Sequence, residues 1–380
     1  MCGARATDDM TTMSLPNIPI VSLDDIRSND PIRQARATQA LKLGFGTFGL
    51  VYVSDHDVTP AQQDRFYTAF QRFTSRPTSV KERYARADLW YQRGWTPPNT
   101  EKAVASGGSR PDFKECWFAA PIDYDKIAMK IHPELYAPNV WPNDDDEFRE
   151  VYMEMGRLCH AVGETLLRGV AQSYNLDDAD TFTKLVHGAP HVFRALRYLP
   201  LNEEQVAAGL LWGEEHTDFN LLTILPGGKF LNSQGQTCPK PDDASGLFLR
   251  TRPTSEHPNG QLISGLAPPG CMVAQVGQQL EILTGGELIA TPHVIAAPKV
   301  PRYSRLSSAH FVHVHTDVVL RPIGPFATEQ SVAAYRPPVL ASTYDLKTLV
   351  DIGLAPRSAL DALGYRNYDR LTVAHAVERK

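Results

Sequence analysis

The chain has few cysteines and no pattern that would join them. Its five cysteines are odd in number, scattered through 380 residues and never spaced as CxxC. This excludes a zinc knuckle or a disulfide framework and is typical of reduced thiols in a cytosolic protein. No apolar run approaches the length of a membrane span, and residues 1–13 lack the apolar segment of a signal peptide. We therefore expect a cytoplasmic protein with no membrane partner.

The sequence also lacks a basic block or a stripe of lysines and arginines. Its formal net charge is −5 and its pI is near 6.2, which argues against a nucleic-acid partner. Apolar residues make up 42% of the chain and charged residues 21%, the ordinary proportions of a globular enzyme. A chain of this length can bury a sizeable core, in one large domain or two modest ones.

The hydrophobic pattern divides the chain into a helix-rich first half and a β-rich second half. The first half predicts strands at 18–23 and 48–53 and helices at 31–43, at 60–73 and after residue 146, where apolar residues recur at three- and four-residue steps. Beyond residue 190, short β-rich runs alternate with Gly/Pro turns. We expect strands at 192–199, 221–225, 247–251, 271–276, 280–283, 290–295 and 306–315. Such a series predicts a sandwich, barrel or jelly roll.

Four regions follow from this pattern. We expect a disordered leader at 1–16, a helix-rich N-terminal region at 17–185, a β-rich core at 186–320 and a C-terminal helical extension at 321–380, with a helix at about 343–363. Within the core, the polar segment 230–245 predicts an excursion loop.

One group of residues has the pattern of a metal site. His216 and Asp218 belong to an HTD tripeptide, and His293 follows in the segment TPHV. Two imidazoles and one carboxylate are the ligand set of a non-haem Fe(II) site that keeps one face open. On a β-strand, residues i and i+2 project from the same face, so His216 and Asp218 can hold one ion together. The alternative is a surface histidine and a solvated aspartate near a turn.

A 2-oxo acid on such an ion needs a partner for its distal carboxylate, and the planar fork of a guanidinium suits it. Two RxS tripeptides follow His293 and begin at Arg302 and Arg305. We favour Arg305 with Ser307, because the same strand face continues through position 313. Arg302 adjoins Pro301 in what reads as the preceding loop. For either arginine the alternative is a solvated position at the rim.

Further motifs occur in a fixed order. They are PIVSL (19–23), GF (44–45) with Val53 and His56, RGWTP (93–97), PDFKE (111–115), the HTD tripeptide, GLFL (246–249), TGG (284–286) and TPHV (291–294). Over roughly residues 16–320 the series resembles the isopenicillin N synthase-like branch of the Fe(II)/2-oxoglutarate-dependent oxygenases. The resemblance implies an α+β fold with a mainly β core. That core is a double-stranded β-helix, or jelly roll, with a helix-rich N-terminal region and a C-terminal helix.

The resemblance also implies the cofactors Fe(II), 2-oxoglutarate and O2. The implied metal ligands are His216, Asp218 and His293, and the implied 2-oxoglutarate contacts are Arg305, Ser307 and Tyr198. The implied activity is hydroxylation, desaturation or cyclisation of a small-molecule substrate, with release of succinate and CO2. Natural-product or amino-acid metabolism is the expected setting.

One motif departs from the family. Where the family often has NYYP, this chain has Arg197-Tyr198-Leu199-Pro200. We expect Arg197 to share the inward face with Leu199 and to meet the oxo acid, an acidic substrate or a nearby carboxylate at the barrel edge. The expected substrate contacts are therefore Arg197, Leu199 and Phe219.

Three other functions stay open. The first is an oxidase of the isopenicillin N synthase type, which uses no oxo acid. The second is an enzyme of the ethylene-forming type, which fragments 2-oxoglutarate and whose members share the long gap between Asp218 and His293. The third is a non-catalytic ligand-binding jelly roll.

Overall fold

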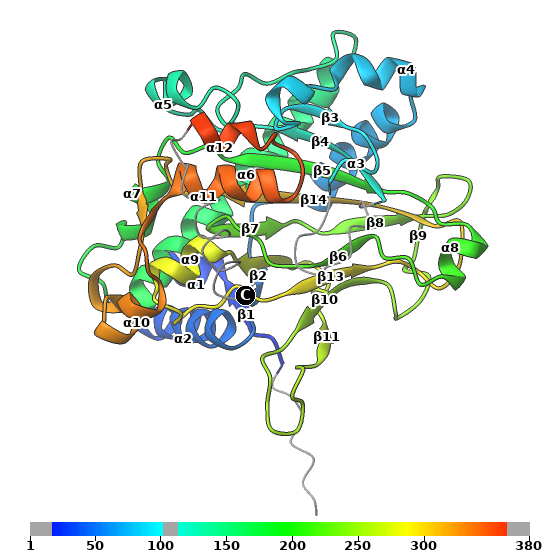
Figure 1. The fold of residues 1–380 in the computed structure, drawn as a ribbon. Coiled ribbons are helices and arrows are strands. Elements are labelled where there is room, and N and C mark those ends of the chain that lie inside the picture. The colour runs from blue at the N-terminus through cyan, green and yellow to red at the C-terminus, as the bar shows by residue number, and fades with distance from the viewer. Residues whose placement is uncertain (1–16, 102–112, 363–380) are drawn as a thin grey trace, which may run out of the picture.

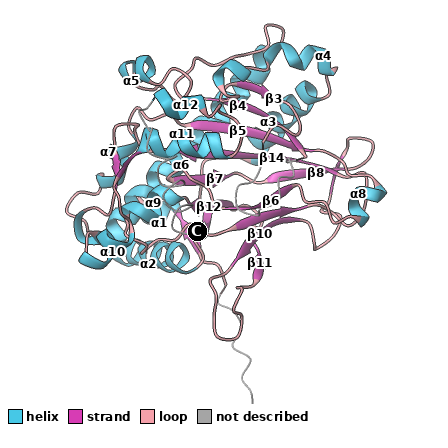
Figure 2. Ribbon diagram, in the orientation of Figure 1, coloured by secondary structure: helices cyan, strands magenta, loops and turns pink. Residues whose placement is uncertain are grey.

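Two facing β-sheets form the centre of the molecule, and helices cover the outer face of the larger sheet (Figures 1 and 2). The structure, a computed structural model, describes residues 17–101 and 113–362. The expected leader at 1–16 lies outside the described residues. Among the helices within these ranges, none combines the length and the apolar character that a membrane span requires.

The larger sheet has ten strands and mixes both halves of the chain. Apart from the parallel pair β1–β2, its neighbouring strands run antiparallel. Its main path is β1 (Ile20–Ser22), β2 (Leu50–Ser54), β12 (Met272–Val276), β7 (Leu222–Leu225), β14 (Ser304–Val312), β5 (Val192–Tyr198), β4 (Lys114–Ala119) and β3 (Gly94–Thr96). The hairpin of β8 (Gly228–Leu231) and β9 (Thr237–Cys238) pairs with β14, so part of the expected excursion loop joins the sheet.

The smaller sheet has four strands and carries two of the candidate metal ligands. Its order is β11 (Leu262–Ser264), β10 (Gly246–Arg250), β13 (His293–Ala296) and β6 (Gly213–His216). The fold is the jelly roll that the sequence predicts, with a helix-rich N-terminal part and C-terminal helices. A separate two-stranded ribbon, β15 (Val319–Leu320) with β16 (Val339–Leu340), precedes the last helices.

The helices are concentrated at the N-terminal half and the C-terminal end of the described chain. They are α1 (Leu23–Ile26), α2 (Pro31–Thr47), α3 (Pro60–Thr74), α4 (Thr78–Lys81), α5 (Lys126–Ile131), α6 (Asp146–Ser173), α7 (Thr181–Val186), α8 (Glu203–Ala207), α9 (Gln278–Leu283), α10 (Glu329–Ala334), α11 (Ala341–Asp351) and α12 (Ser358–Ala362).

Helix α6 is the main support of the larger sheet. Asp145 caps it by accepting a hydrogen bond from the backbone N–H of Phe148 at 3.1 Å, and acidic residues in the first turn complement the helix dipole. Its apolar stripe is fully buried and packs on β7 and β14. The Tyr152 hydroxyl lies 2.8 Å from the carbonyl oxygen of Trp117 and 2.6 Å from that of Phe193. It thereby ties α6 to β4 and β5.

Two expectations about secondary structure are wrong. The apolar run 280–283 belongs to α9 and not to a strand, because a short apolar run fits a buried helix as well as a buried strand. The helix expected at 343–363 is two helices, α11 and α12, separated by Gly353 at φ +82° and Pro356.

Gly277 allows α9 to start against the segment that carries Asp218. A Cβ atom at position 277 would lie 2.0 Å from the carbonyl oxygen of Asn220, which is backbone and cannot move aside. We expect Gly277→Ala to lower the free energy of unfolding by roughly 1–3 kcal/mol through overpacking. Gly213→Ala is the matched control, because its Cβ would meet Ile295 at an ordinary 3.4 Å. Urea unfolding measures both, and equal midpoints for Gly277→Ala and the parent chain would contradict the expectation.

Candidate active site

His216, Asp218 and His293 converge on one point between the two sheets. One ligand atom from each, a ring nitrogen or a carboxylate oxygen, lies within 4.8 Å of the others. Nε2 of His216 is 3.8 Å from Oδ1 of Asp218, and Nε2 of His293 is 3.9 Å from the same oxygen. The strand register places the two histidines opposite each other on β6 and β13. Asp218 follows the end of β6 and is not itself in a strand. The loop after β6, and not the alternation of side chains along a strand, therefore brings its carboxylate to the two histidines.

The hydrogen bonds of His216 leave its Nε2 available. Nδ1 lies 2.7 Å from the carbonyl oxygen of Glu214 and therefore carries the proton that it donates there. Metal-ligating histidines commonly donate their second nitrogen in this way, which fixes the tautomer and the ring orientation.

His293 is held by Gln275. Its Nδ1 lies 2.6 Å from the side-chain amide of Gln275, and Oε1 of that amide is buried without a hydrogen-bond partner. Rotating the amide by half a turn lets Oε1 accept the proton of Nδ1 and satisfies both groups, with Nε2 left to face a cation. Burial, with the neighbouring His216, lowers the pKa of His293 to about 4 despite the opposing effect of Asp218. The ring is thus neutral near pH 7, as a ligand must be.

Asp218 is oriented from the side away from the histidines. Thr223 on β7 donates its hydroxyl hydrogen to Oδ2 of Asp218 at 2.7 Å, so Oδ1 is the oxygen that faces the two imidazoles. The backbone carbonyl of Asp218 also accepts from the N–H of Gln278 at 2.8 Å.

This donor set fits a divalent transition metal. Two neutral imidazoles and a carboxylate suit Fe(II), and within residues 17–101 and 113–362 no fourth histidine, cysteine or carboxylate joins the group. Cavities adjoin the group on two sides, so coordination positions remain for other ligands.

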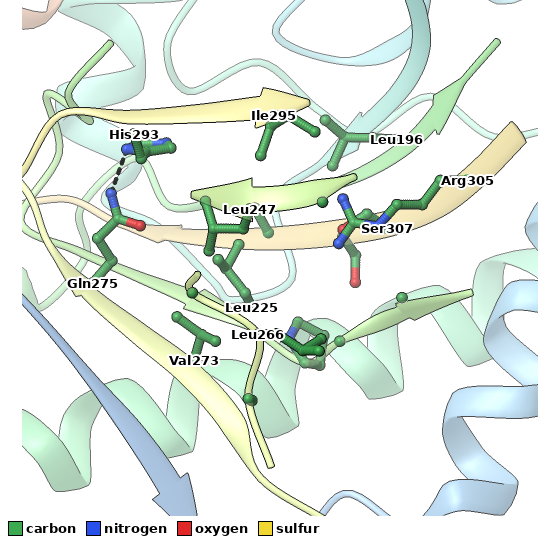
Figure 3. A pocket seen from close by; sticks show the side chains of 18 of the residues that line it. Leu196, Leu225, Leu247, Leu266, Val273, Gln275, His293, Ile295, Arg305 and Ser307 are labelled. Carbon is green, nitrogen blue, oxygen red and sulfur yellow. Dashed lines mark hydrogen bonds between the residues drawn. The ribbon is translucent and has the colours of Figure 1, made fainter. Parts of the chain in front are cut away.

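An inner cavity of about 330 Å³ lies between the two sheets (Figure 3). His293 and Gln275 lie at one end of it, and Arg305 with Ser307 at the other. The middle is apolar and is lined by Leu196, Leu225, Leu247, Val273 and Ile295. The cavity therefore suits a short chain with an anionic group at each end.

Arg305 is held in this cavity by aromatic rings. Its guanidinium carbon lies 5.7 Å from the ring centre of Tyr198 and 5.9 Å from that of Phe230. Ser307 lies two residues along β14 on the same face and is buried. Tyr198 pairs directly with Arg305 across β5 and β14 and lines the same cavity.

Arg302 lies elsewhere. It stands outside β14 in the left-handed region at φ +69°, and 74% of its side chain is exposed, with Glu203 as a distant partner at 3.9 Å. Of the two sequence candidates, the structure brings Arg305 into the cavity and leaves Arg302 on the surface.

The expected inward positions of Arg197 and Leu199 are wrong. On β5, the residues that line the inner cavity are Arg194, Leu196 and Tyr198, so the odd-numbered positions face the helices. Arg197 donates to the backbone carbonyl of Thr74 at 3.1 Å and to Glu115 at 3.3 Å. The physical reason is the period of two in a strand, where a shift of one residue moves a side chain to the other face.

An outer cavity of about 600 Å³ lies on the other side of the metal group. Phe219, the third expected substrate contact, lines it. So do residues from α11, among them Tyr344, and the walls include Phe118, Val192, Phe311 and Leu354. Sequence reasoning missed Arg194, which lines both cavities. Counting back from Tyr198 in steps of two along β5 would have found it.

Helix α11 is tied to the HTD segment through α9. The Tyr344 hydroxyl donates to Oε1 of Gln278, and Nε2 of Gln278 donates to the hydroxyl of Thr217. The next residue, Gln279, donates to Asp345 at 2.7 Å and accepts from the backbone N–H of Val314 at 3.1 Å. The wall of the outer cavity and the metal group are thus parts of one hydrogen-bonded network.

The sequence is similar to that of known non-haem dioxygenases and 2-oxoglutarate-dependent enzymes. Residues 18–144 match the family model described as non-haem dioxygenase in morphine synthesis N-terminal. The chain is 24% identical to the 2-oxoglutarate-dependent ethylene/succinate-forming enzyme of Ralstonia nicotianae, over 83% of this chain and 86% of that protein. It is also 24% identical to homoarginine-6-hydroxylase of Arabidopsis thaliana, over 82% and 87%.

Solved structures share the fold. A protein of Caulobacter crescentus assigned to the 2OG-Fe(II) oxygenase family is 26% identical with a TM-score of 0.69, over 88% of this chain and 99% of that one. The Neurospora crassa T7H in complex with alpha-KG is 21% identical with a TM-score of 0.70, over 88% and 96%.

Thr223 offers a test of the carboxylate's orientation. Thr223→Val removes the hydroxyl that donates to Asp218, and we expect affinity for Fe(II) to fall roughly 10- to 100-fold, as is usual when a ligand loses its supporting hydrogen bond. Anaerobic titration calorimetry measures this. Thr38→Val is the control, because Thr38 bonds only to backbone carbonyls within α2. Unchanged affinity in Thr223→Val would mean that the hydroxyl does not hold the carboxylate in place.

Proposed function

We propose that this chain is an Fe(II)- and 2-oxoglutarate-dependent oxygenase in which His216, Asp218 and His293 hold the ferrous ion. The enzyme oxidises a small-molecule substrate. Bound Fe(II) and 2-oxoglutarate together activate O2 for this oxidation, and 2-oxoglutarate leaves as succinate and CO2. The protein's part is placement of the reactants and exclusion of water.

The observation that carries the proposed site is the inner cavity with its two polar ends. A five-carbon dicarboxylate needs a metal at its oxo-acid end and a cation at its far end, separated by apolar walls. The inner cavity offers the three ligands at one end and Arg305 at the other. Arg305 presents a fork of donors to the distal carboxylate. Ser307 adds a hydroxyl beside it, and the ring of Tyr198 holds the guanidinium in position.

The outer cavity is the proposed site of the primary substrate. It opens on His216 and Asp218, and Phe219 contributes to its wall. Substrate and 2-oxoglutarate thus approach the metal from different sides.

The proposed functional regions follow the same division. All the proposed ligands of the metal and of 2-oxoglutarate lie in the core region 186–320. The helix-rich region 17–185 supplies α6 and four strands of the larger sheet, and the region from 321 onward supplies α11 over the outer cavity. We propose that the three regions act as one catalytic unit.

Oxygen consumption tests the proposed function. With Fe(II), 2-oxoglutarate and O2, we expect the protein to form succinate, at a rate that rises when a substrate is present. Asp218→Ala should abolish succinate formation because it removes a ligand. Arg302→Gln serves as a control, because its side chain is exposed and every proposed ligand is kept. Oxygen uptake that needs no 2-oxoglutarate would instead indicate an oxidase of the isopenicillin N synthase type.

A second candidate function is supported by the Ralstonia relative, whose name includes ethylene formation. The same reaction mixture distinguishes it, because ethylene accumulates in the gas phase only if 2-oxoglutarate itself is fragmented. Gas chromatography of the headspace measures it. Succinate without ethylene would leave substrate oxidation as the activity.

The two RxS arginines form a matched pair for testing the co-substrate site. We expect Arg305→Gln to weaken 2-oxoglutarate binding roughly 10- to 100-fold, because a charged, two-pronged hydrogen bond to the distal carboxylate is lost. Arg302→Gln should leave binding unchanged, since that side chain is exposed. Anaerobic titration of the Fe(II)-loaded protein measures both dissociation constants. A loss with Arg302→Gln and none with Arg305→Gln would reverse the assignment.

A further inference from the structure

A buried group of charged residues lies where the outer cavity meets the metal site. Glu101 contacts Lys114 and Arg194 through a single oxygen, Oε2, with Nζ of Lys114 at 3.0 Å. The side chains are 9%, 8% and 13% exposed respectively. All three line the outer cavity. Burial by itself raises the pKa of Glu101, but Arg194 and Lys114 outweigh it and lower the pKa to about 2, so the carboxylate is ionised.

Two polar atoms of this group have no hydrogen-bond partner. They are Oε1 of Glu101, an acceptor, and Nε of Arg194, a donor, and both are buried. A buried charged group with an unmet hydrogen bond is costly, so such atoms indicate that a ligand completes the site. The guanidinium of Arg194 is also fixed, since its carbon lies 5.0 Å from the ring centre of Phe118. The group therefore offers one acceptor, Oε1 of Glu101, and one donor, Nε of Arg194, to a ligand.

The other charged residues around the outer cavity already face partners. Lys347 pairs with Asp351, and His313, whose Nδ1 also lacks a hydrogen bond, lies 3.6 Å from the carboxylate of Asp345. Glu101 and Arg194 differ from these residues because they contact each other and still leave one acceptor and one donor without a partner.

The co-substrate does not complete this group. Arg194 lines the inner cavity as well, but Glu101 lines only the outer one. A 2-oxoglutarate dianion has no N–H to offer Oε1 of Glu101, and its carboxylates would be repelled by that oxygen. A primary substrate in the outer cavity has neither difficulty.

We propose that the primary substrate carries an amino-acid head group, with its carboxylate on Arg194 and its ammonium N–H on Glu101. The apolar body lies against Phe118, Phe219 and Phe311, which line the same cavity. This assignment rests on the proposed function, because it places the substrate beside the metal group. It makes Arg194 and Glu101 specificity residues of this chain.

Three small probes test the head group on the intact protein loaded with Fe(II) and 2-oxoglutarate without O2. L-Phenylalanine has both charged groups, 3-phenylpropanoate lacks the ammonium and 2-phenylethylamine lacks the carboxylate. By calorimetry, we expect L-phenylalanine to bind at least about tenfold more tightly than either fragment, since each charged hydrogen bond contributes separately. Equal affinities for the three, or binding of none, would overturn the proposal without any variant being made.

Two variants separate the contributions of the two residues. Glu101→Gln should remove most of the preference for L-phenylalanine over 3-phenylpropanoate, and Arg194→Gln should remove most of its preference over 2-phenylethylamine. Arg302→Gln should keep both preferences, because Arg302 is exposed and lines neither cavity. If both variants lose both preferences equally, the residues hold the cavity's shape and do not read the head group.

Titration of 2-oxoglutarate into the same proteins distinguishes a failure of the proposed function from a failure of the head-group assignment. If 2-oxoglutarate does not bind the parent protein, the proposed function fails. If it binds and the probes show no preference, only the head-group assignment fails. If Arg194→Gln weakens 2-oxoglutarate and leaves L-phenylalanine unaffected, Arg194 belongs to the co-substrate and the proposal is overturned.

Discussion

The register between β6 and β13 is the constraint on which the rest of the site depends. It sets His216 opposite His293, with ring centres 4.4 Å apart, and the pairing is irregular just after His293. Asp218, beyond the end of β6, is brought to the same point by Thr223 from the facing sheet and by the start of α9. Since each ligand is oriented by its own hydrogen bond, the backbone and the supporting side chains arrange the group before any ion is bound.

The metal group stands between two cavities of different character. The inner one lies between the sheets, and side chains from their strands give it an apolar middle. The outer one is closed by loops and by α11, which gives it more room and more varied walls. In each cavity an arginine is held against aromatic rings, Arg305 by Tyr198 and Phe230 and Arg194 by Phe118. Stacking of this kind fixes a guanidinium and leaves its donors for a ligand.

The C-terminal helices are integral to this arrangement. At the start of α9, Gln278 connects Thr217 of the HTD segment with Tyr344 of α11, and Gln279 connects Val314 with Asp345 of α11. A change in the position of α11 would therefore reach Thr217, the residue between two proposed ligands. The wall that surrounds the substrate and the loop that presents Asp218 are mechanically coupled.

Local pattern in the sequence was enough for the metal group and for much of the jelly roll. Arg305 and Ser307 share one face of β14, as the strand period predicts, and most expected strands are present. The HTD tripeptide is identified by its residue types, because Asp218 lies in the loop after β6 and not on a strand. The sequence alone does not decide which face of β5 points inward, and the structure puts Arg194, not Arg197, in the cavity. It also could not identify 280–283 as a helix, because apolar runs of that length carry no period.

Only the tertiary structure determines which residues form the outer cavity. Its walls come from Gln92, from β4 and β5, from the loop after β6 and from α11, segments that meet only through packing. The residues that form these walls follow no regular spacing in the sequence. Glu101 and Arg194, which contact each other and each keep one atom without a hydrogen bond, are also far apart in the chain. The sequence thus determined the proposed metal ligands, because their residue types and the short segments around them identify them without knowledge of the packing. Packing between distant segments determined which molecules can reach the proposed metal site.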